Sequence, residues 1–358
     1  MGSKKILFLS ARFSEEYPMV LRWKNYYHSR QINFVYNKIE WNFYTNKKII
    51  KLILVLKIFS VVRSKGIDFI HVNDLESGML GKYLYGLFGI KYIYSAHEIF
   101  SQESPEDTVG SHSRIVKTSV ENEVMSNASM VFVPNKQRIS FLENLYPNID
   151  PGKFILAENK ALEEINIPLE ERFSSSINNN LFSVFYGGTF WHARKQEEFP
   201  LLAETLHKNG CEFILSGSSN EYLSTLLGQT DKFNYLGDIP PTQFQEVIKK
   251  MDLCLAWYYP TTVNDELCAP LKIFDYLLAG KPVVAPRLPY IEALELQFPK
   301  CIILFDTGDM EDCLEKIMQV RNNYNEYLRA VEDLDKNKLS WHSQYEFFDS
   351  TFKEQNLL

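Results

Sequence analysis

The chain has few cysteines, and their arrangement would not hold a structure together. Its 358 residues include five cysteines, which all lie in the second half and form no C-x-x-C pair. An odd number of cysteines without metal-binding spacing argues against a disulfide framework and against a cysteine zinc site. We therefore expect reduced thiols, no bound metal and a cytoplasmic protein.

Long apolar runs are also missing. The most apolar stretch, residues 49–62, contains two lysines and is too short to cross a bilayer as a helix. Near the start, only Ile6–Leu9 form an apolar run, which fits a first strand better than a secretory signal. We expect neither a membrane span nor a signal peptide.

Charge is unevenly distributed along the chain. The net charge is −7, but residues 1–100 hold 15 Lys and Arg against 7 Asp and Glu, which leaves the remainder strongly acidic. The basic first part predicts an anionic partner, such as the inner face of a membrane or a lipid-linked phosphate. A solvated face with no partner is the alternative. Nucleic acid is not expected, because the whole chain is acidic and has no reading motif.

Strands and helices alternate along the chain, which predicts an α/β protein with parallel sheets. The expected strands are 5–10, 31–37, 69–72, 92–95, 130–134, 154–157, 182–186, 212–216, 233–236, 253–257, 282–285 and 301–305. Residues 158–180 are charged and then rich in Ser and Asn, as in a connection between domains.

This pattern predicts two doubly wound, Rossmann-like domains that face each other across a cleft. Residues 1–165 would form the first domain and residues 166–335 the second. The aromatic tail, residues 336–358, would pack back toward the first domain as a helix. Ligands of such sheets bind at the carboxyl ends of the strands.

No G-x-G-x-x-G fingerprint is present, but residues 264–286 contain a different anion-binding pattern. A short amphipathic helix is expected between Pro270 and Gly280, which suit its beginning and its end. Free N–H groups at such a beginning attract an anion, and Lys272 in the first turn would strengthen the site. Asp275, one turn later, could bind the hydroxyls of a ribose. The alternative is an ordinary strand–helix unit with a surface Lys and Asp.

A second glycine-containing loop, FYGGTFWHARK at 185–195, follows the first strand of the second domain. Gly187 and Gly188 would let the backbone approach a ligand closely. Arg194 and Lys195 place two positive charges where a loop can fold over a phosphate. Basic residues at a helix start are also common on ordinary surfaces.

In the first domain, polar residues follow the expected strands. His97 is positioned to hydrogen-bond a substrate hydroxyl, although a structural histidine is the commoner case. Glu98 begins an acidic loop, residues 98–107, which we interpret as an acceptor wall, and Arg12 is a candidate for an acceptor anion. The group His71, Asn73 and Asp74 either supports His97 or caps the next helix, and we favour capping for Asp74.

Two basic segments of the first domain are candidates for a membrane surface. One is the expected helix at residues 46–65, and the other is the aromatic and basic run at residues 22–30.

Several of these segments resemble the retaining GT-B glycosyltransferases of the family-four type, also called glycosyl transferases group 1. The segment PLKIFDYLLAGKPVVA closely matches the family pattern P-L-K-L-F-E-Y-L-A-A-G-K-P-V-V-A. The segment from FIHVNDLESG to YSAHE is similar to a second family stretch. Asn159 stands where the family has an asparagine before its linker.

The resemblance implies transfer of a sugar, with retention, from a UDP- or GDP-sugar to a hydroxyl of a glycan or lipid-linked acceptor. It implies surface polysaccharide biosynthesis, no metal and no further cofactor. Residues 1–165 would be the acceptor-binding domain and residues 166–335 the nucleotide-sugar-binding domain. Asp275 would hold the ribose, Arg194 and Lys195 would neutralise the leaving phosphate, and His97 would approach the transferred sugar. The remaining donor contacts would come from Gly187, Gly188, Gly237, Ile239, Glu266, Ala269, Pro270, Leu271 and Lys272.

Three features depart from the family pattern. Leu267 stands where the family has its upstream glutamate, with Glu266 one residue away; the basic pair is adjacent; and the first loop lacks glycines. Two alternatives therefore stay open. One is a nucleotide-sugar epimerase or hydrolase of the same fold, and the other is a non-catalytic partner subunit that binds a nucleotide-sugar.

Overall fold

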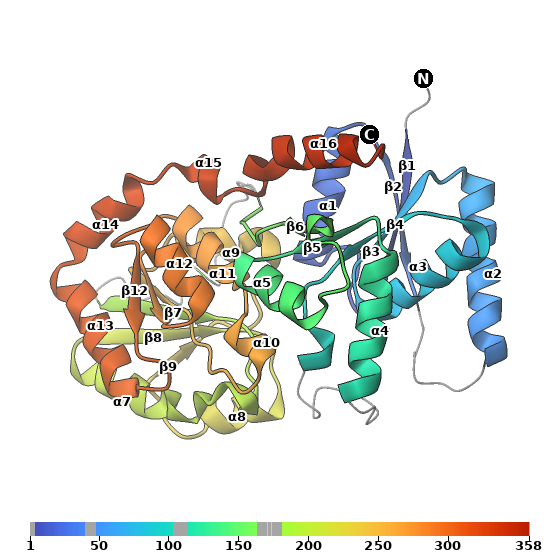
Figure 1. Ribbon diagram of the computed structural model, residues 1–358. Coiled ribbons are helices and arrows are strands. Elements are labelled where there is room, and N and C mark those ends of the chain that lie inside the picture. The colour runs from blue at the N-terminus through green and yellow to red at the C-terminus, as the bar shows by residue number, and fades with distance from the viewer. Residues whose placement is uncertain are drawn as a thin grey trace. The chain divides into compact units, whose positions relative to one another are not determined.

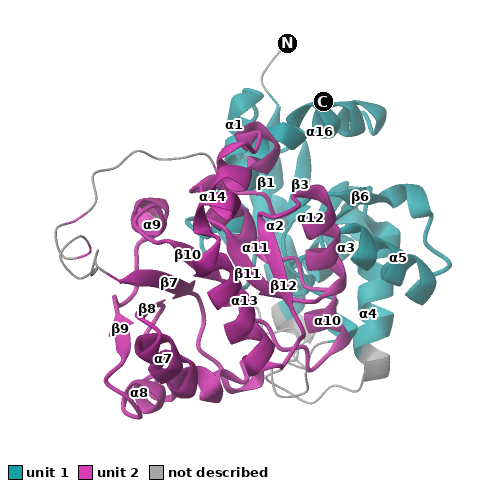
Figure 2. Ribbon diagram, turned by 90° about the vertical axis from the view of Figure 1, so that its left-hand side faces the viewer, with its two compact units in different colours: residues 1–158, 341–358 teal, residues 159–340 magenta. Residues whose placement is uncertain are grey.

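The computed structural model describes residues 4–39, 48–102, 114–162, 170, 173 and 181–357. The chain divides into two compact units (Figure 2): residues 1–158 with 341–358 form unit 1, and residues 159–340 form unit 2. Several residues of the sequence predictions lie outside the described part, namely Asn46, Lys47, Glu103, Glu106, Asp107, Ser113 and most of 158–180.

Unit 1 contains a six-stranded parallel sheet in the order β2-β1-β3-β4-β5-β6. Its strands are β1 (Lys5–Ser10), β2 (Asn33–Lys38), β3 (Phe69–Val72), β4 (Tyr92–Ser95), β5 (Met130–Val133) and β6 (Phe154–Leu156). The chain runs from β1 to β2 on one side and then returns to β3 on the other. The carboxyl ends of β1 and β3 therefore form the switch point at which such sheets bind ligands.

Helices cover both faces of this sheet (Figure 1), which explains why β3, β4 and β5 are buried along their whole length. They are α1 (Pro18–Ser29), α2 (Lys48–Lys65), α3 (Leu75–Phe88), α4 (Arg114–Asn127), α5 (Lys136–Leu145) and α16 (Tyr345–Glu354). Asp74 caps α3, as predicted: its side chain accepts from the backbone N–H of Ser77 in a capping box.

The C-terminal helix belongs to the core of unit 1. Phe348 and Phe352 of α16 pack with Trp23 and Tyr26 of α1 against β3 and β5. The Trp341 indole donates to the carbonyl of Arg22 at 2.9 Å. The tail thus supplies one side of the hydrophobic core.

This packing corrects the interpretation of residues 22–30 as a membrane surface. The run lies in and just after α1, and Arg22, Trp23, Tyr26 and Tyr27 are all buried. These positions share one helical face, which turns toward the sheet. Arg30 forms an ion pair with Asp349 of α16 at 2.7 Å. The run is a core element and is not available to a bilayer.

Unit 2 contains a second six-stranded parallel sheet, in the order β12-β11-β10-β7-β8-β9. Its strands are β7 (Phe182–Gly187), β8 (Cys211–Ser216), β9 (Phe233–Tyr235), β10 (Leu253–Leu255), β11 (Val283–Pro286) and β12 (Ile302–Phe305). The order reverses between β7 and β10, so the loops after these two strands meet at the switch point.

The helices of unit 2 pack on both faces of its sheet and form two apolar clusters with it. They are α7 (Phe199–Lys208), α8 (Glu221–Leu227), α9 (Pro241–Ile248), α10 (Val263–Glu266), α11 (Leu271–Leu278), α12 (Pro289–Gln297), α13 (Met310–Asn322), α14 (Tyr324–Glu332) and α15 (Lys336–Leu339). The sequence pattern predicts one helix over 310–329 after the last strand, whereas the structure forms two helices separated at Asn323. Helix α12 was not predicted.

The ends of α11 follow the sequence prediction closely. Pro270 is the N-cap rather than the first helical residue, and Gly280 follows the last turn with a φ of 80°. The N–H of Gly280 donates to Leu277 and that of Lys281 to Tyr276, which closes the helix.

Two predicted absences concern the described residues. The five cysteines are free thiols, and four of them are buried. No helix within the described ranges is both long enough and apolar enough to cross a membrane.

Candidate functional site

The strongest candidate site in unit 2 is built by the loops after β7 and β10. Trp257, just after β10, donates its indole N–H to the carbonyl of Arg194 at 2.7 Å. This bond fixes the backbone of the β7 loop. The Arg194 guanidinium then lies 4.9 Å from the ring centroid of Tyr258. The switch point of the sheet thus holds a permanent positive charge.

Lys272, in the first turn of α11, brings a second cation to the same place. Its Nζ lies 4.7 Å from the ring centroid of Tyr186 and 5.3 Å from that of Tyr258. The Nζ is buried and has no hydrogen-bond partner among the described residues. Burial, and next the charge of Arg194, hold the pKa of Lys272 well below its usual value. A buried, unpartnered ammonium is unfavourable unless an anion joins it.

Gly188 provides the space for this ammonium. A β-carbon on Gly188 would overlap with the Lys272 Nζ. Gly187 has a different role, because a β-carbon there would meet the rings of Phe185 and Phe244 at 2.9 Å. The two glycines were predicted to let the backbone approach a ligand. In the structure they leave room for a lysine side chain and for two aromatic rings, and their close approach to a ligand stays a prediction.

The loop before α11 is tied to the start of unit 2. The Asn159 side chain donates to the carbonyl of Ala269 at 2.9 Å, next to the N-cap Pro270. This bond fixes the backbone at the point where α11 begins. It thereby fixes the position of the N–H groups in the first turn of α11, including those of Leu271 and Lys272. Asp275 follows Lys272 and is partly exposed. Its role with a ribose stays a prediction.

Glu266 and Leu267 lie close to this loop. Glu266 ends the short helix α10 and is exposed, whereas Leu267 caps α10 and is partly buried. Neither observation decides whether Glu266 does the work of the missing upstream glutamate, which stays a prediction.

The adjacent basic residues Arg194 and Lys195 point to different surroundings. Lys195 has a φ of 49°, and this left-handed conformation turns the chain between two short 3₁₀ segments. Its side chain is exposed, with Nζ 3.9 Å from the ring centroid of Tyr259. The structure brings Arg194 and Lys272 to the same tyrosine ring, while Lys195 lies over a different one.

Two further predicted donor contacts lie after β9. Gly237 has a φ of 77°, and its carbonyl accepts from Gly217 N–H at 3.1 Å and from Ser216 Oγ at 2.9 Å. Ile239 is buried in the apolar cluster that also contains Ile273 of α11. Contact between these backbone atoms and a nucleobase stays a prediction.

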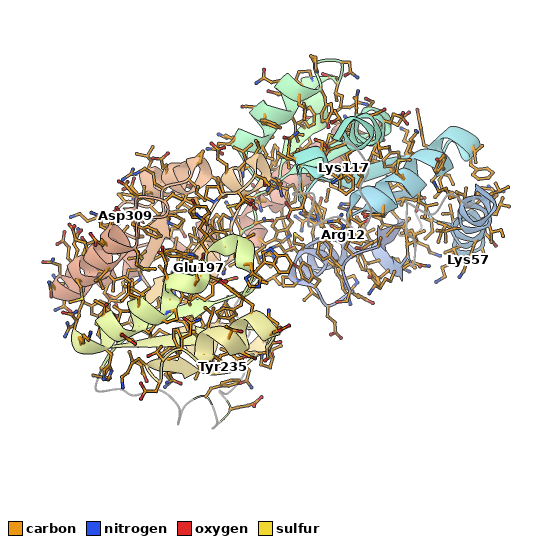
Figure 3. The ribbon with its side chains drawn as sticks, turned by 90° about the horizontal axis from the view of Figure 1, so that it is seen from below. Arg12, Lys57, Lys117, Glu197, Tyr235 and Asp309 are labelled. Atoms are coloured by element: carbon orange, nitrogen blue, oxygen red, sulfur yellow. The ribbon has the colours of Figure 1, made fainter. Side chains whose placement is uncertain are left out.

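Unit 1 has its own pocket at the carboxyl ends of β1, β3 and β4. It is lined by residues from each of these strand ends, including Arg12, Asn73, His97, Glu98 and Phe100. Figure 3 labels Arg12. Two predicted acceptor residues, Arg12 and Glu98, and the predicted catalytic His97 thus share one pocket.

His97 is held as a neutral imidazole in this pocket. Its Nε2 lies 2.8 Å from the Asn73 side-chain oxygen, so Nε2 carries the proton and donates it. Burial, then the charges of Arg138 and Arg22, lower the pKa of His97 to about 3. The Asn73 side-chain nitrogen is buried and, within the described ranges, has no hydrogen-bond partner. The pocket therefore offers donors and acceptors suited to an uncharged hydroxyl.

Two of the pocket residues are part of ion pairs. Arg12 lies 3.3 Å from Glu76 and its guanidinium is 5.6 Å from the Phe100 ring centroid. Glu98 lies 3.6 Å from Arg138, which also donates to the carbonyl of His97. These pairs fix both side chains at the rim of the pocket.

Sequence reasoning missed Glu121, which supports the pocket of unit 1. Glu121 of α4 is buried and accepts from Phe100 N–H at 2.7 Å and from Tyr146 OH at 2.6 Å, which holds the turn after Glu98. His71 is structural, because its ring nitrogens bond Tyr27 OH and Ser95 Oγ, both at 2.8 Å. A buried carboxylate in a helix gives no local signal of its distant partners.

Comparisons with known proteins place this fold among glycosyltransferases. No family model matches the sequence, and no curated protein matches it. Solved structures do match over nearly the whole chain. Sucrose-phosphate synthase of Thermosynechococcus elongatus has 13% identity and a TM-score of 0.74, with 98% of each chain covered. HepE of Anabaena in complex with UDP-glucose has 15% identity and a TM-score of 0.71, with 98% of this chain and 99% of that chain covered.

The same fold also occurs with another chemistry. A protein of Listeria monocytogenes named as a UDP-N-acetylglucosamine 2-epimerase has 11% identity and a TM-score of 0.63, with 99% of this chain and 98% of that chain covered. At such identities the likeness establishes the fold, which is the two-domain α/β fold of the GT-B glycosyltransferases. It does not establish the reaction.

Proposed function

We propose that this protein is a glycosyltransferase that moves a sugar from a nucleotide diphosphate to a hydroxyl group. The observation that carries the proposal is the buried Lys272 ammonium, which lacks a partner beside Arg194 at the switch point of unit 2. A diphosphate would supply the missing negative charge. The complex of HepE with UDP-glucose, a protein of the same fold, supports a UDP-sugar as donor; a GDP-sugar is the other candidate.

The chemistry follows from where charge develops. When the glycosidic bond to the diphosphate breaks, negative charge builds on the phosphate oxygens. Arg194, Lys272 and the N–H groups at the start of α11 would stabilise that charge most strongly in the transition state. This arrangement would let the enzyme work without a metal. By resemblance, we expect attack on the same face of the sugar, with retention of configuration.

We further propose that the pocket of unit 1 receives the acceptor and the transferred sugar. His97 would act there as a neutral hydrogen-bonding group, because its low pKa keeps it uncharged near neutral pH. Asn73 would donate to a sugar hydroxyl, and Glu98 and Arg12 would line the acceptor. A glycan or a lipid-linked sugar fits this set, and surface polysaccharide synthesis on the inner face of a membrane would be its setting.

A ligand screen tests the donor assignment directly. UDP-, GDP- and ADP-sugars should be compared by thermal shift, because a ligand that binds only the folded state raises its stability. At least one should stabilise the wild type, and Lys272→Met should abolish the shift while Lys208→Met, on an exposed site of α7, should not. Asp275→Ala should weaken binding if Asp275 holds the ribose. No shift with any compound at saturating concentration would refute the proposal.

The epimerase-like structure supports one competing function on the same fold. An epimerase or hydrolase would consume the nucleotide-sugar with no acceptor present. Donor turnover in the absence of acceptor, with an epimer or a free sugar as product, would therefore favour that alternative. Binding without any turnover would favour a non-catalytic partner subunit.

A further inference from the structure

Two neighbouring helices of unit 1 expose several large apolar side chains. We call this the α2–α3 surface; it comprises Leu52, Ile53, Leu56, Tyr85, Leu87 and Phe88. Phe59 of α2 stacks on Phe88 of α3 with ring centroids 3.8 Å apart, which joins the two helices into one face. Ile53 and Leu87 are each 60% exposed.

Helix α2 is packed firmly against unit 1, although one of its sides exposes apolar side chains. The opposite side of α2 is anchored, because Val55, Ile58 and Val62 are buried in unit 1. Among the described residues, six of the eleven exposed large hydrophobics belong to this one surface. Single exposed apolar residues are ordinary, but a cluster of this kind marks an interaction site.

The charged residues of α2, and those of α3 after its first turn, are all basic. Neither residues 47–67 nor residues 77–97 contain an Asp or Glu. Lys57, Arg63 and Lys65 are exposed on α2, and Figure 3 labels Lys57 at the outer edge of unit 1. Three neighbouring acidic groups are engaged: Asp68 accepts from Lys5 N–H, Glu76 pairs with Arg12, and Glu123 pairs with Lys82.

We propose that the α2–α3 surface binds an anionic phospholipid bilayer. Leu52, Ile53, Leu56, Leu87 and Phe88 enter the boundary between headgroups and acyl chains, while Lys57 and Arg63 contact the lipid phosphates. Long basic side chains can lie along an apolar surface and keep their charges at the headgroups. The tyrosine at position 85 suits the same boundary. This inference goes beyond the proposed reaction, since no residue of the Arg194–Lys272 cluster takes part in it.

Vesicle co-sedimentation of the full chain tests the proposal. The probes are vesicles of phosphatidylcholine alone and vesicles of phosphatidylcholine and phosphatidylglycerol in equal parts. One variant, Ile53→Ser with Leu56→Ser, removes apolar contacts, and its control is Leu201→Ser with Leu296→Ser on unit 2. A second variant, Lys57→Glu with Arg63→Glu, reverses charges, and its control is Lys136→Glu with Lys353→Glu. All eight positions are exposed, so folding is expected to persist.

The wild type should bind the anionic vesicles and not the neutral ones. The charge variant should bind them at least about thirtyfold more weakly, and the apolar variant about tenfold or more, while both controls bind as the wild type does. Equal binding to both kinds of vesicle, or unchanged binding by either variant, would overturn the proposal. A dimer seen by light scattering that Ile53→Ser with Leu56→Ser dissociates would also overturn the proposal, because the α2–α3 surface would then bind a second copy of this chain. Thermal shifts by nucleotide-sugars should not change in these variants, which separates a failure here from a failure of the donor assignment.

Discussion

The Nζ of Lys272 lies against Gly188, in the position that a β-carbon on residue 188 would take. The two residues come from the loop after β7 and from the first turn of α11, and they are 84 positions apart in sequence. The position of the Lys272 ammonium at the switch point therefore depends on the absence of a side chain at Gly188, in the loop after β7.

We predict that Gly188→Ala displaces the Lys272 ammonium and weakens nucleotide-sugar binding. Hydrogen bonds to charged groups contribute about 1.5–3 kcal/mol, so affinity should fall by roughly tenfold to a hundredfold. Calorimetric titration with the donor found in the ligand screen would measure the change. Gly66→Ala is the matched control, because its φ of 61°, like the 158° of Gly188, disfavours a side chain, while nothing lies within 4 Å of a β-carbon there. Unchanged affinity in Gly188→Ala would mean that Lys272 does not contact the donor.

Lys272 should destabilise the empty protein. The pKa of Lys272 is lowered in the folded state, so the unfolded chain binds the proton more tightly. The contribution of Lys272 to the free energy of unfolding therefore rises as pH increases toward the pKa of the unfolded chain. Lys272→Met removes the penalty, and we expect it to raise the free energy of unfolding of the ligand-free protein near neutral pH by about 1–3 kcal/mol. Urea unfolding without ligand would measure it. A less stable variant would show that the ammonium is satisfied in the empty site.

Donor binding should also take up a proton through Lys272. A diphosphate beside Nζ raises the pKa of Lys272 again. At a pH above the pKa that Lys272 has in the ligand-free protein, a proton therefore binds together with the nucleotide. The affinity for the nucleotide then falls as pH rises. Calorimetry in buffers of different ionisation enthalpy, at about pH 8, would count the proton. Lys272→Met should abolish this uptake. Equal uptake in the variant would assign the proton to another group.

The sequence was sufficient to predict most of the fold. Periodicity identified the twelve strands to within a few residues, because buried parallel strands are short apolar runs between polar breaks. The break at Asn323 was missed, since the helical pattern continues through it and only the packing of α14 separates the two helices. Helix α12 was also missed, although Pro289 and the spacing of Tyr290, Ile291 and Leu294 signal a helix.

For the candidate site, the sequence locates the loops that follow the strand ends, but it does not give the side-chain contacts within them. Arg194 and Lys272 both stand after strand ends, which sequence alone can locate. The separation of Lys195 from Arg194 depends on a left-handed backbone at residue 195, which nothing in the local pattern requires. The contacts of Lys272 with Tyr186 and Tyr258 depend on the packing of three segments that are distant in sequence. Such contacts are properties of the assembled fold.

We predict unequal effects for the two adjacent basic residues. Arg194→Ala should reduce sugar transfer by about a hundredfold to a thousandfold, on the scale of a lost transition-state donor. Lys195→Ala should reduce it less than about fivefold, because an exposed charge is well screened by water. Steady-state rates with a UDP-sugar, reported as kcat and KM, would show the difference. Equal losses would place both charges on the diphosphate and would mean that Lys195 turns inward when donor binds.

The last prediction concerns acid stability, which His71 and His97 should both limit. Burial lowers the pKa of each histidine in the folded state, to about 3 for His97. An unfolded histidine has a pKa of about 6.5, so the unfolded chain binds more protons below that value and stability is lost as pH falls. At about pH 5, His97 costs the folded state about 2 kcal/mol relative to neutral pH, and His71 acts in the same direction.

Urea unfolding between about pH 7.5 and pH 5 tests this, with hydrogen exchange of β3 and β4 as the readout for unit 1. His71→Gln with His97→Gln should lower stability at neutral pH, because their hydrogen bonds to Ser95 and Asn73 are lost. It should also flatten the dependence of stability on pH, which a merely disruptive substitution would not do. His207→Gln, at an exposed position of α7, should leave the slope unchanged. If the double variant keeps the wild-type slope, the acid-sensitive groups lie elsewhere, and the neutral imidazole assigned to His97 in the pocket of unit 1 loses its support.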